Sequence, residues 1–415
     1  MSEYHALASP SSSEKWLNCP NSLAMEIGQP EGDTKAADLG TDKHELMALC
    51  LTFGKNAMDY EGHVLSKGHT VNKELTHDVQ SVVDSVNERM STYRLRGGDV
   101  SIDVEQDVPI THVTAEPDAT GRVDIVLRVS WPDGNTDVEV IDAKFGWQEV
   151  LAERNTQGMM YLAGAIEKFS LTEDFRNATF IIEQPARGVS DEWSTTPDEI
   201  AAFVEDARPK AQKAITIHKL ACEGQRALKE EDFNPSEKTC QWCKAKAVCP
   251  ALKAKVEETI ERDFETLDPD SNLAALAEHV SVERLGKIFP NLELVEDWAK
   301  AVRARIEHEI FAGNAVPGVK VVAGKKGNRA WSSEEEAEAM MKKFKMKQEQ
   351  MYSFKLLGPK PILDSLKDQP RRLKQIEALV IQPPGKPHVV HESDKRPAIE
   401  IKPVEDGFET VDDLC

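Results

Sequence analysis

The sequence has few of the features that mark membrane or secreted proteins. Aromatic residues make up 6% of the chain, and no apolar run approaches the roughly 18 residues that a membrane-spanning helix needs. The first residues, Met1 to His5, lack the basic and then apolar pattern of a signal peptide. The cysteines number seven and several are grouped, which suits a reducing compartment better than a disulfide framework. We therefore expect a cytoplasmic protein without a membrane partner.

Positive charge is also scarce. The chain has 51 lysines and arginines against 72 aspartates and glutamates, for a net charge of −21. General binding of polyanions requires lysine and arginine to neutralise phosphates. Any nucleic acid must therefore meet a local basic groove or a metal centre. The length of 415 residues allows one large domain with an accessory domain, or two to three ordinary ones.

Four cysteines have the spacing of a metal site. Cys240, Cys243 and Cys249 form a C-x2-C-x5-C motif, and Cys19 lies far upstream. Closing a loop of about 220 residues is no obstacle, because the cost of closure grows by only about 0.6 kcal/mol per doubling of length. Both an iron–sulfur cluster and Zn²⁺ accept four thiolates. The cysteines interpreted as free thiols are Cys50, Cys222 and Cys415.

Hydrophobic periodicity predicts an α/β protein. The expected strands are 99–110, 121–130, 137–145 and 178–183, with a turn at 131–135. The expected helices are 11–19, one after Gly40, 76–96, 148–169 and 197–229. Beyond residue 262 the pattern is mostly helical, with a possible hairpin at 319–331 and a Lys-rich helix at 334–348. The end of the chain, 381–415, is Pro-rich and then acidic, which predicts disorder.

Acidic residues and a lysine meet on two of these strands. Alternation in 121–130 places Val123, Ile125, Leu127 and Val129 on one face and Asp124 on the other. Asp142 and Lys144, two residues apart, point the same way. Two carboxylates and the imidazole of His44 can hold Mg²⁺ or Mn²⁺ and leave positions open for water and a phosphate oxygen. Lys144 would orient the nucleophile or stabilise charge on the phosphate, so the set is complete for phosphodiester hydrolysis.

The motifs resemble, in the same order, those of the RecB-like branch of the PD-(D/E)XK nuclease superfamily, which includes CRISPR-associated and AddB-type nucleases with an iron–sulfur staple. The matching positions are Ser9 to Cys19-Pro20, Gly40 to His44, Gly121 to Asp124, Asp142-Ala143-Lys144, Gln157 to Tyr161 and Cys240 to Pro250. The resemblance covers about residues 1–255. The chain also looks like an uncharacterised family of phage and prophage proteins with the same opening and a similar C-terminal extension.

The resemblance implies a restriction-endonuclease-like core, a mixed central sheet flanked by helices, with a mostly helical C-terminal extension. It assigns residues 1–255 to the nuclease domain, 262–380 to an accessory region and 381–415 to a tail. The metal ligands would be His44, Asp124, Asp142 and the carbonyl of Ala143, with Lys144 as the catalytic lysine. Gln157 and Tyr161 would position the DNA strand. The residues implied to hold a [4Fe-4S] cluster, or alternatively structural Zn²⁺, are Cys19, Cys240, Cys243 and Cys249.

Two functions follow as hypotheses. The first is a Mg²⁺- or Mn²⁺-dependent deoxyribonuclease, an exonuclease acting on single strands or duplex ends in phage recombination or end processing. It would work in the cytoplasm of a bacterial host, with a phage recombination or single-strand-binding protein as a possible partner. The second is a catalytically silent DNA-binding adaptor with the same fold. The segments 325–329 and 341–347 mix basic and apolar residues, which fits either a strand-binding surface or solvated faces, and the solvated faces are preferred.

Overall fold

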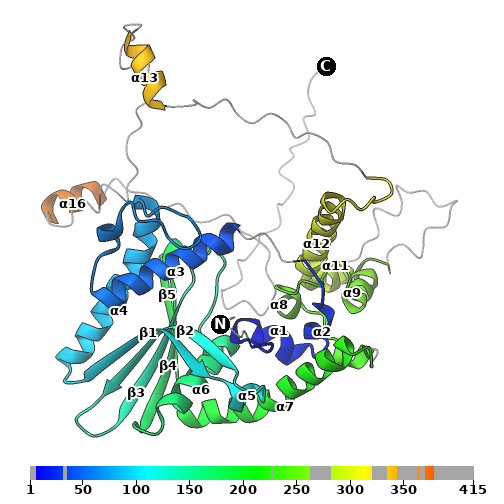
Figure 1. Ribbon diagram of the computed structural model, residues 1–415, viewed down its shortest axis with the longest axis horizontal. Coiled ribbons are helices and arrows are strands. Elements are labelled where there is room, and N and C mark those ends of the chain that lie inside the picture. Colours follow the sequence, from blue (N-terminus) through cyan, green and yellow to red (C-terminus); the bar gives the residue numbers. More distant parts are fainter. Residues whose placement is uncertain are drawn as a thin grey trace, which may run out of the picture. The chain divides into compact units, whose positions relative to one another are not determined.

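The computed structural model describes residues 6–30, 35–225, 228–261, 282–319, 334–343, 363 and 370–377. The chain forms two compact units, Met1–Ala315 and Val316–Cys415. Figure 1 shows the first unit as a central sheet with helices on both faces. No helix among the described residues is both long and apolar enough to span a membrane.

The sheet is mixed and its strands follow one another in chain order. They are β1 Asp99–Pro109, β2 Thr120–Ser130, β3 Thr136–Ala143, β4 Phe175–Gln184 and β5 Val189–Thr195. β3 and β4 are parallel, and the other neighbouring pairs are antiparallel. The β2–β3 hairpin turns at residues 131–135, where Gly134 has a positive φ of 88° that favours glycine. The predicted α/β class is confirmed, and every predicted strand is present.

Some helices of the first unit cover the two faces of the sheet, and the others follow the sheet in the sequence. Before and beside the sheet are α1 Ser13–Asn18, α2 Ser22–Met25, α3 Lys35–Phe53, α4 Lys73–Leu95, α5 Thr111–Thr114, α6 Thr156–Phe169 and α7 Pro197–Cys222. After them come α8 Glu237–Cys240, α9 Pro250–Glu261, α11 Val282–Ile288 and α12 Leu292–Phe311. Single 3-10 turns are η1 Pro10–Ser12, η2 Ala57–Tyr60, η3 Pro185–Arg187, η4 Glu230–Asp232 and η5 Phe289–Asn291.

One face of the sheet is covered by α3 and α4 (Figure 1). Asn72 starts α4 by accepting hydrogen bonds from the backbone N–H groups of Glu74 and Leu75. The buried valines of α4 recur with helical spacing at positions 79, 82, 83 and 86. They pack with Ile125, Leu127 and Ile141 from the strands. This layer fixes α3, and α3 carries His44 to the sheet.

The opposite face is covered by α6 and α7 (Figure 1). Asn155 caps α6 through the N–H of Gly158, and Thr196 caps α7 through the N–H of Glu199. α7 packs through small residues, three of which are Ala207, Ala211 and Ala214. Val123 joins this core, whereas Ile125, Leu127 and Val129 join the other one. The prediction that these four residues share one face is therefore wrong for Val123.

The N-terminal segment packs beside a segment from the other end of the first unit. α1 contacts both α7 and α8, and α12 contacts α8 and α9. The backbone N–H of Asn21 donates to the carbonyl of Asp232, and the Asn21 side chain donates to the carbonyl of Lys229. Residues more than 200 positions apart in the sequence are thus held together by direct hydrogen bonds.

Several element boundaries differ from those expected. α3 begins at Lys35, before Gly40, and α6 begins only at Thr156 because Asn155 caps it there. α7 ends at Cys222, just before Gly224, whose φ of 65° stops the helix. β5 has no counterpart in the sequence prediction. The first compact unit extends to Ala315 and therefore includes α9, α11 and α12 as well as the sheet. The predicted division into a nuclease domain ending at 255 and an accessory region starting at 262 stays a prediction.

In the second unit the structure describes α13 Glu334–Lys343 and α16 Pro370–Glu377. α13 confirms the start of the helix predicted at 334–348, whose last residues lie outside the described part. The predicted hairpin at 319–331 and the predicted tail at 381–415 lie outside the described residues except for Val319.

Gly158 and Gly40 provide a matched test of the packing on α6. A Cβ at Gly158 would lie 2.2 Å from the ring of buried Phe180, whereas a Cβ at Gly40 would meet nothing within 4 Å. We expect Gly158→Ala to lower the free energy of unfolding by about 1–3 kcal/mol because of overpacking. Gly40→Ala should raise it by up to about 1 kcal/mol, since alanine is the better helix former. Chemical denaturation measures both, and equal effects would contradict the packing described here.

Candidate functional site

β2 and β3 separate at one end of the sheet, and the acidic residues lie there. Their last paired residues are Ile125 and Ile141, so Asp124 and Asp142 follow directly after the point where pairing stops. On the outer side, Glu105 of β1 has φ 50° and no partner in the register between β1 and β2. Where neighbouring strands do not pair through backbone hydrogen bonds, side chains have room to come together between them.

The side chain of Asp124 bonds to the backbone of β3 just beyond the last paired residues of β2 and β3. Its Oδ2 accepts a 2.8 Å hydrogen bond from the backbone N–H of Ala143. Its Oδ1 lies 3.3 Å from Nδ1 of His44, which is on α3. The His44 ring also meets the edge of Phe145, with 5.1 Å between ring centroids. Asp124 therefore ties together β2, β3 and α3.

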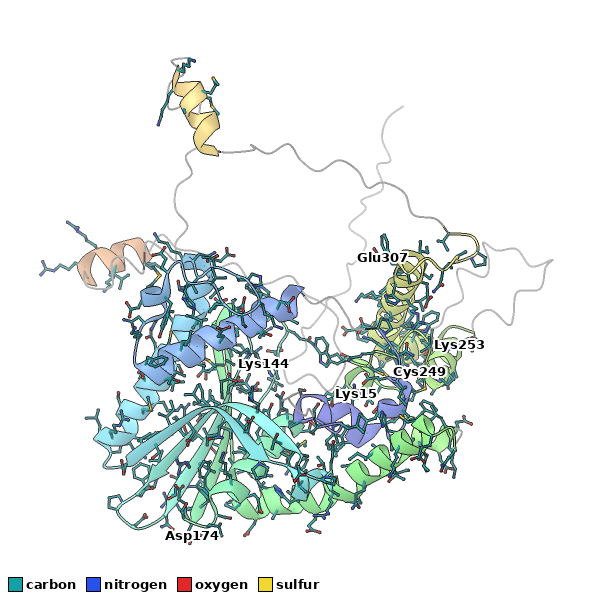
Figure 2. The ribbon with its side chains drawn as sticks, viewed as in Figure 1. Lys15, Lys144, Asp174, Cys249, Lys253 and Glu307 are labelled. Carbon is teal, nitrogen blue, oxygen red and sulfur yellow. The ribbon has the colours of Figure 1, made fainter. Side chains whose placement is uncertain are left out.

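Asp142 and Lys144 form an ion pair at the end of β3. Lys144 Nζ lies 2.7 Å from Asp142 Oδ2, and Asp142 is only 3% exposed. Gln157 on α6 accepts from Lys144 Nζ at 3.3 Å. The same amide donates to Asp142 Oδ1 at 3.4 Å and to the hydroxyl of Tyr161 at 3.2 Å. Figure 2 shows Lys144 at this end of the sheet, near α3.

We call these residues the acidic site: His44, Glu105, Asp124, Asp142, Lys144, Gln157 and Tyr161. Glu105 is the member that sequence reasoning missed. The structure brings together all the predicted catalytic side chains and the predicted side-chain metal ligands. Ala143 contributes its N–H to Asp124, and the predicted role of its carbonyl as a metal ligand stays a prediction.

Burial and close charges set the protonation of the acidic site. Burial raises the pKa of Asp142, and Asp124 adds to this although Lys144 opposes it. Burial would also raise the pKa of Asp124, but His44, the Ala143 N–H and Lys144 outweigh burial and hold it below its usual value. For Lys144, burial acts to lower the pKa, and the ion pair with Asp142 outweighs it and raises the pKa.

His44 and Glu105, which lie beside Asp124 at one corner of the acidic site, bind protons more tightly than usual. Burial would lower the pKa of His44, but the carboxylates of Asp124, Asp142 and Glu105 outweigh burial and raise it. Burial and then the charge of Asp124 raise the pKa of Glu105 to about 6. Negative charge thus accumulates here beyond what Lys144 neutralises, which is the electrostatic setting that a cation relieves.

A divalent cation fits the donor set at this corner. One ligand atom from each of His44, Glu105 and Asp124 lies within 4.8 Å of the others. The buried Oε1 of Glu105 has no hydrogen-bond partner at this corner. Carboxylate oxygens with one imidazole suit Mg²⁺ or Mn²⁺. These residues are therefore suited to hold such an ion.

Gly121 explains how the N-terminal segment reaches the acidic site. A Cβ at Gly121 would lie 2.9 Å from Pro10 Cγ and 3.1 Å from the ring of Tyr161. Only glycine permits Pro10 and Tyr161 to pack this closely over β2. The Ser13 hydroxyl is 2.7 Å from that of Thr156, which joins the start of α1 to the start of α6.

The four predicted cysteine ligands line one pocket, named here the cysteine pocket: Cys19, Cys240, Cys243 and Cys249. Cys19 follows α1, Cys240 ends α8, and Cys249 precedes α9. All four are free thiols. In Figure 2, Cys249 lies among the helices that follow the sheet, apart from Lys144.

Burial opposes the ionisation of three of these thiols. Burial raises the pKa of Cys19, raises that of Cys240 to about 11, and raises that of Cys243 to about 12. These three thiols would ionise and become ligands only where the positive charge of a metal offsets the cost of ionisation. Cys50 is buried elsewhere and Cys222 is exposed, which agrees with their interpretation as free cysteines, and Cys415 lies outside the described residues.

The mixed sheet between two helical layers places this chain among α/β proteins. It belongs to the family described as "Protein of unknown function (DUF2800)", which matches residues 5–397. One solved structure, titled "Crystal structure of SSO0001", matches 58% of this chain and 97% of its own length at 13% identity with a TM-score of 0.20.

Metal affinity at the acidic site should rise with pH. Binding must displace protons from Glu105, with its pKa of about 6, and from His44, with its raised pKa. Titration calorimetry with Mn²⁺ should show affinity increasing between about pH 5.5 and 7.5 and then levelling off. Glu105→Gln should weaken binding about tenfold or more. Unchanged affinity in that variant would exclude Glu105 as a ligand.

Proposed function

We propose that this protein is a Mg²⁺- or Mn²⁺-dependent DNA nuclease with the active site of the RecB-like PD-(D/E)XK enzymes that its motifs resemble. The observation that carries the proposal is the ion pair of Lys144 with buried Asp142, placed beside Asp124 and His44 where β2 and β3 separate. Four side chains from three elements converge on one point. Burying so many ionisable groups is costly, and such convergence is typical of catalytic centres.

The residues have separable roles in phosphodiester hydrolysis. His44, Glu105, Asp124 and Asp142 would hold the cation, which when bound would supply Lewis acidity at the scissile phosphate. Lys144 keeps its charge because its pKa is raised, so its ammonium can donate a hydrogen bond to the attacking water or to a phosphate oxygen. Gln157 holds Lys144 and Asp142 in place through one amide.

The loop after Lys144 supports action on single strands or frayed ends. Trp147 is 77% exposed only three residues beyond Lys144. The loop that carries it is pinned by buried Gln184, which donates to the Gln148 carbonyl at 2.7 Å and accepts from the Val150 N–H at 3.2 Å. A held, exposed indole is suited to stack on an unpaired base. The exposed indole therefore favours exonuclease action on single strands or duplex ends.

The cysteine pocket is proposed to hold an iron–sulfur cluster that fastens the N-terminal segment to α8 and α9. Its lining joins Cys19 to residues more than 200 positions later, so a cluster there would act as an architectural clasp. Four thiolates accept either a [4Fe-4S] cluster or structural Zn²⁺, and metal analysis of the purified protein distinguishes the two.

The cellular setting is proposed from the resemblance alone. We infer a role in phage recombination or end processing in the cytoplasm of a bacterial host, with a phage recombination or single-strand-binding protein as partner. A catalytically silent DNA-binding adaptor is the alternative, and the assay below distinguishes it from a nuclease.

The nuclease proposal predicts loss of activity from single substitutions in the acidic site. Asp142→Asn and Lys144→Ala should each reduce Mg²⁺- or Mn²⁺-dependent degradation of labelled DNA by at least about a hundredfold. Asp206→Asn and Lys210→Ala serve as matched controls, because this ion pair is exposed on α7 outside the site. Wild-type activity in the first two variants would refute the assigned site. A wild-type protein that binds DNA but never cuts it would establish the adaptor.

The cysteine pocket predicts a coloured, iron-containing protein. Anaerobically purified wild type should be brown with a broad visible band, and Cys240→Ser should lose iron and unfold at lower denaturant concentration. Cys222→Ser should retain iron and stability, because Cys222 is exposed and lies outside the pocket. Metal analysis and denaturation measure these changes. Colourless wild-type protein with bound zinc would replace the iron–sulfur assignment by structural zinc.

A further inference from the structure

A groove of about 480 Å³ opens beside the N-terminal turn and has no role in the site described above. We call it the serine groove. It is bordered by the N-terminal turn, α1 and α2 on one side, and by the segment around α8 on the other. The lining residues that matter here are Ser9, Ser11, Ser12, Lys238, Trp242 and Lys244. Its size is that of sites that bind small molecules or parts of larger ligands.

The serine groove begins next to the acidic site. Pro10, between two groove serines, packs against the ring of Tyr161 across Gly121. The hydroxyl of Tyr161 accepts from Gln157, which in turn holds Lys144 and Asp142. Pro10 and Tyr161 are both buried, so this link between the serine turn and the acidic site runs through the core. In the view of Figure 2, Lys15 of α1 lies between Lys144 and Cys249.

The lining carries two kinds of group that recognise a nucleic acid strand. Ser11 is exposed, and the hydroxyls of Ser9 and Ser12 lie 2.9 Å apart, so the turn presents a row of small hydrogen-bonding groups. Opposite them, the indole of Trp242 is 68% exposed, an unusual state for so large an apolar group. Hydroxyls and lysines suit phosphate oxygens, and an exposed indole suits the face of a base.

The charge of the serine groove differs in sign from that of the whole protein. Its charged lining consists of three lysines and two glutamates, and Lys15 and Glu26 neutralise each other in a 2.6 Å ion pair. The remaining charged side chains of the lining are Glu14, Lys238 and Lys244, in a chain whose net charge is −21. A local positive balance on an acidic surface directs a polyanion to this place.

We propose that the serine groove binds a single strand of DNA that extends from the acidic site, with phosphates at Ser11 and Lys238 and an unpaired base on Trp242. A duplex does not fit this chemistry, because its bases are already stacked and cannot cover the indole. The inference rests on the proposed function for the direction of the strand, but binding at the groove can be measured without cleavage.

The test measures the affinity of the full-length protein for fluorescein-labelled oligothymidylate by anisotropy, without added divalent metal. Trp242→Ala should weaken binding about tenfold, and Trp242→Phe should restore most of it because a phenyl ring also stacks. Lys238→Ala should weaken binding and reduce the slope of log affinity against log salt by about 0.7, the value for one phosphate contact on a single strand. Lys253→Ala, an exposed lysine of α9 outside the groove, is the matched control and should bind like wild type.

Metal content and Mn²⁺ affinity are measured on every variant, since Trp242 lies between two cysteines of the cysteine pocket. Trp242→Ala and Lys238→Ala that retain both but bind the oligonucleotide like wild type would overturn the groove assignment, as would a wild type that binds no oligonucleotide. If wild type cuts no DNA with either metal and the two variants still weaken binding, the nuclease proposal fails and the groove stands.

Discussion

The burial of two carboxylates at one end of the sheet is the constraint on which the rest of the first unit depends. Asp142 is 3% exposed and Asp124 lies beside it, and two uncompensated charges there would cost several kcal/mol each. Lys144 and His44 provide the compensation, and they come from different elements. α3 must therefore pack on the sheet with His44 facing inward, and the chain after β3 must bring Lys144 back toward Asp142. The valine layer of α4 and the caps of the helices make that arrangement rigid.

Much of this arrangement could be predicted from sequence because the relevant signals are local. Alternating apolar residues identified β1 to β4, and the two-residue spacing of Asp142 and Lys144 placed both on one side of a strand. His44, Gln157 and Tyr161 were predicted as site residues only from the order of the motifs along the chain, which is an indirect sign of the fold. Those residues lie together in the structure, as the motif order implied. The fold alone does not determine which reaction these residues carry out.

The features that were not predicted have a common physical cause, because contacts with residues distant in the sequence determine the local backbone conformation. Glu105 looks like an ordinary strand residue, and only its φ of 50° beside the separation of β2 and β3 brings it close to His44 and Asp124. Residues 148–155 contain good helix formers, yet the side chain of Gln184 holds Gln148 and Val150 in a loop. β5 alternates only weakly and is recruited by pairing with β4. No window of local sequence contains those partners.

The contact of the N-terminal segment with the segment near Asp232 has a consequence for synthesis on the ribosome. Asn21 emerges early, but the carbonyls of Asp232 and Lys229, which accept from its backbone N–H and its side-chain NH2, are made about 210 residues later. At translation rates of about 5–20 residues per second, that delay is on the order of 10–40 s. During this interval Trp16 and its neighbours lack part of their final packing. The nascent chain therefore exposes a short apolar segment that a chaperone can shield until the later helices arrive.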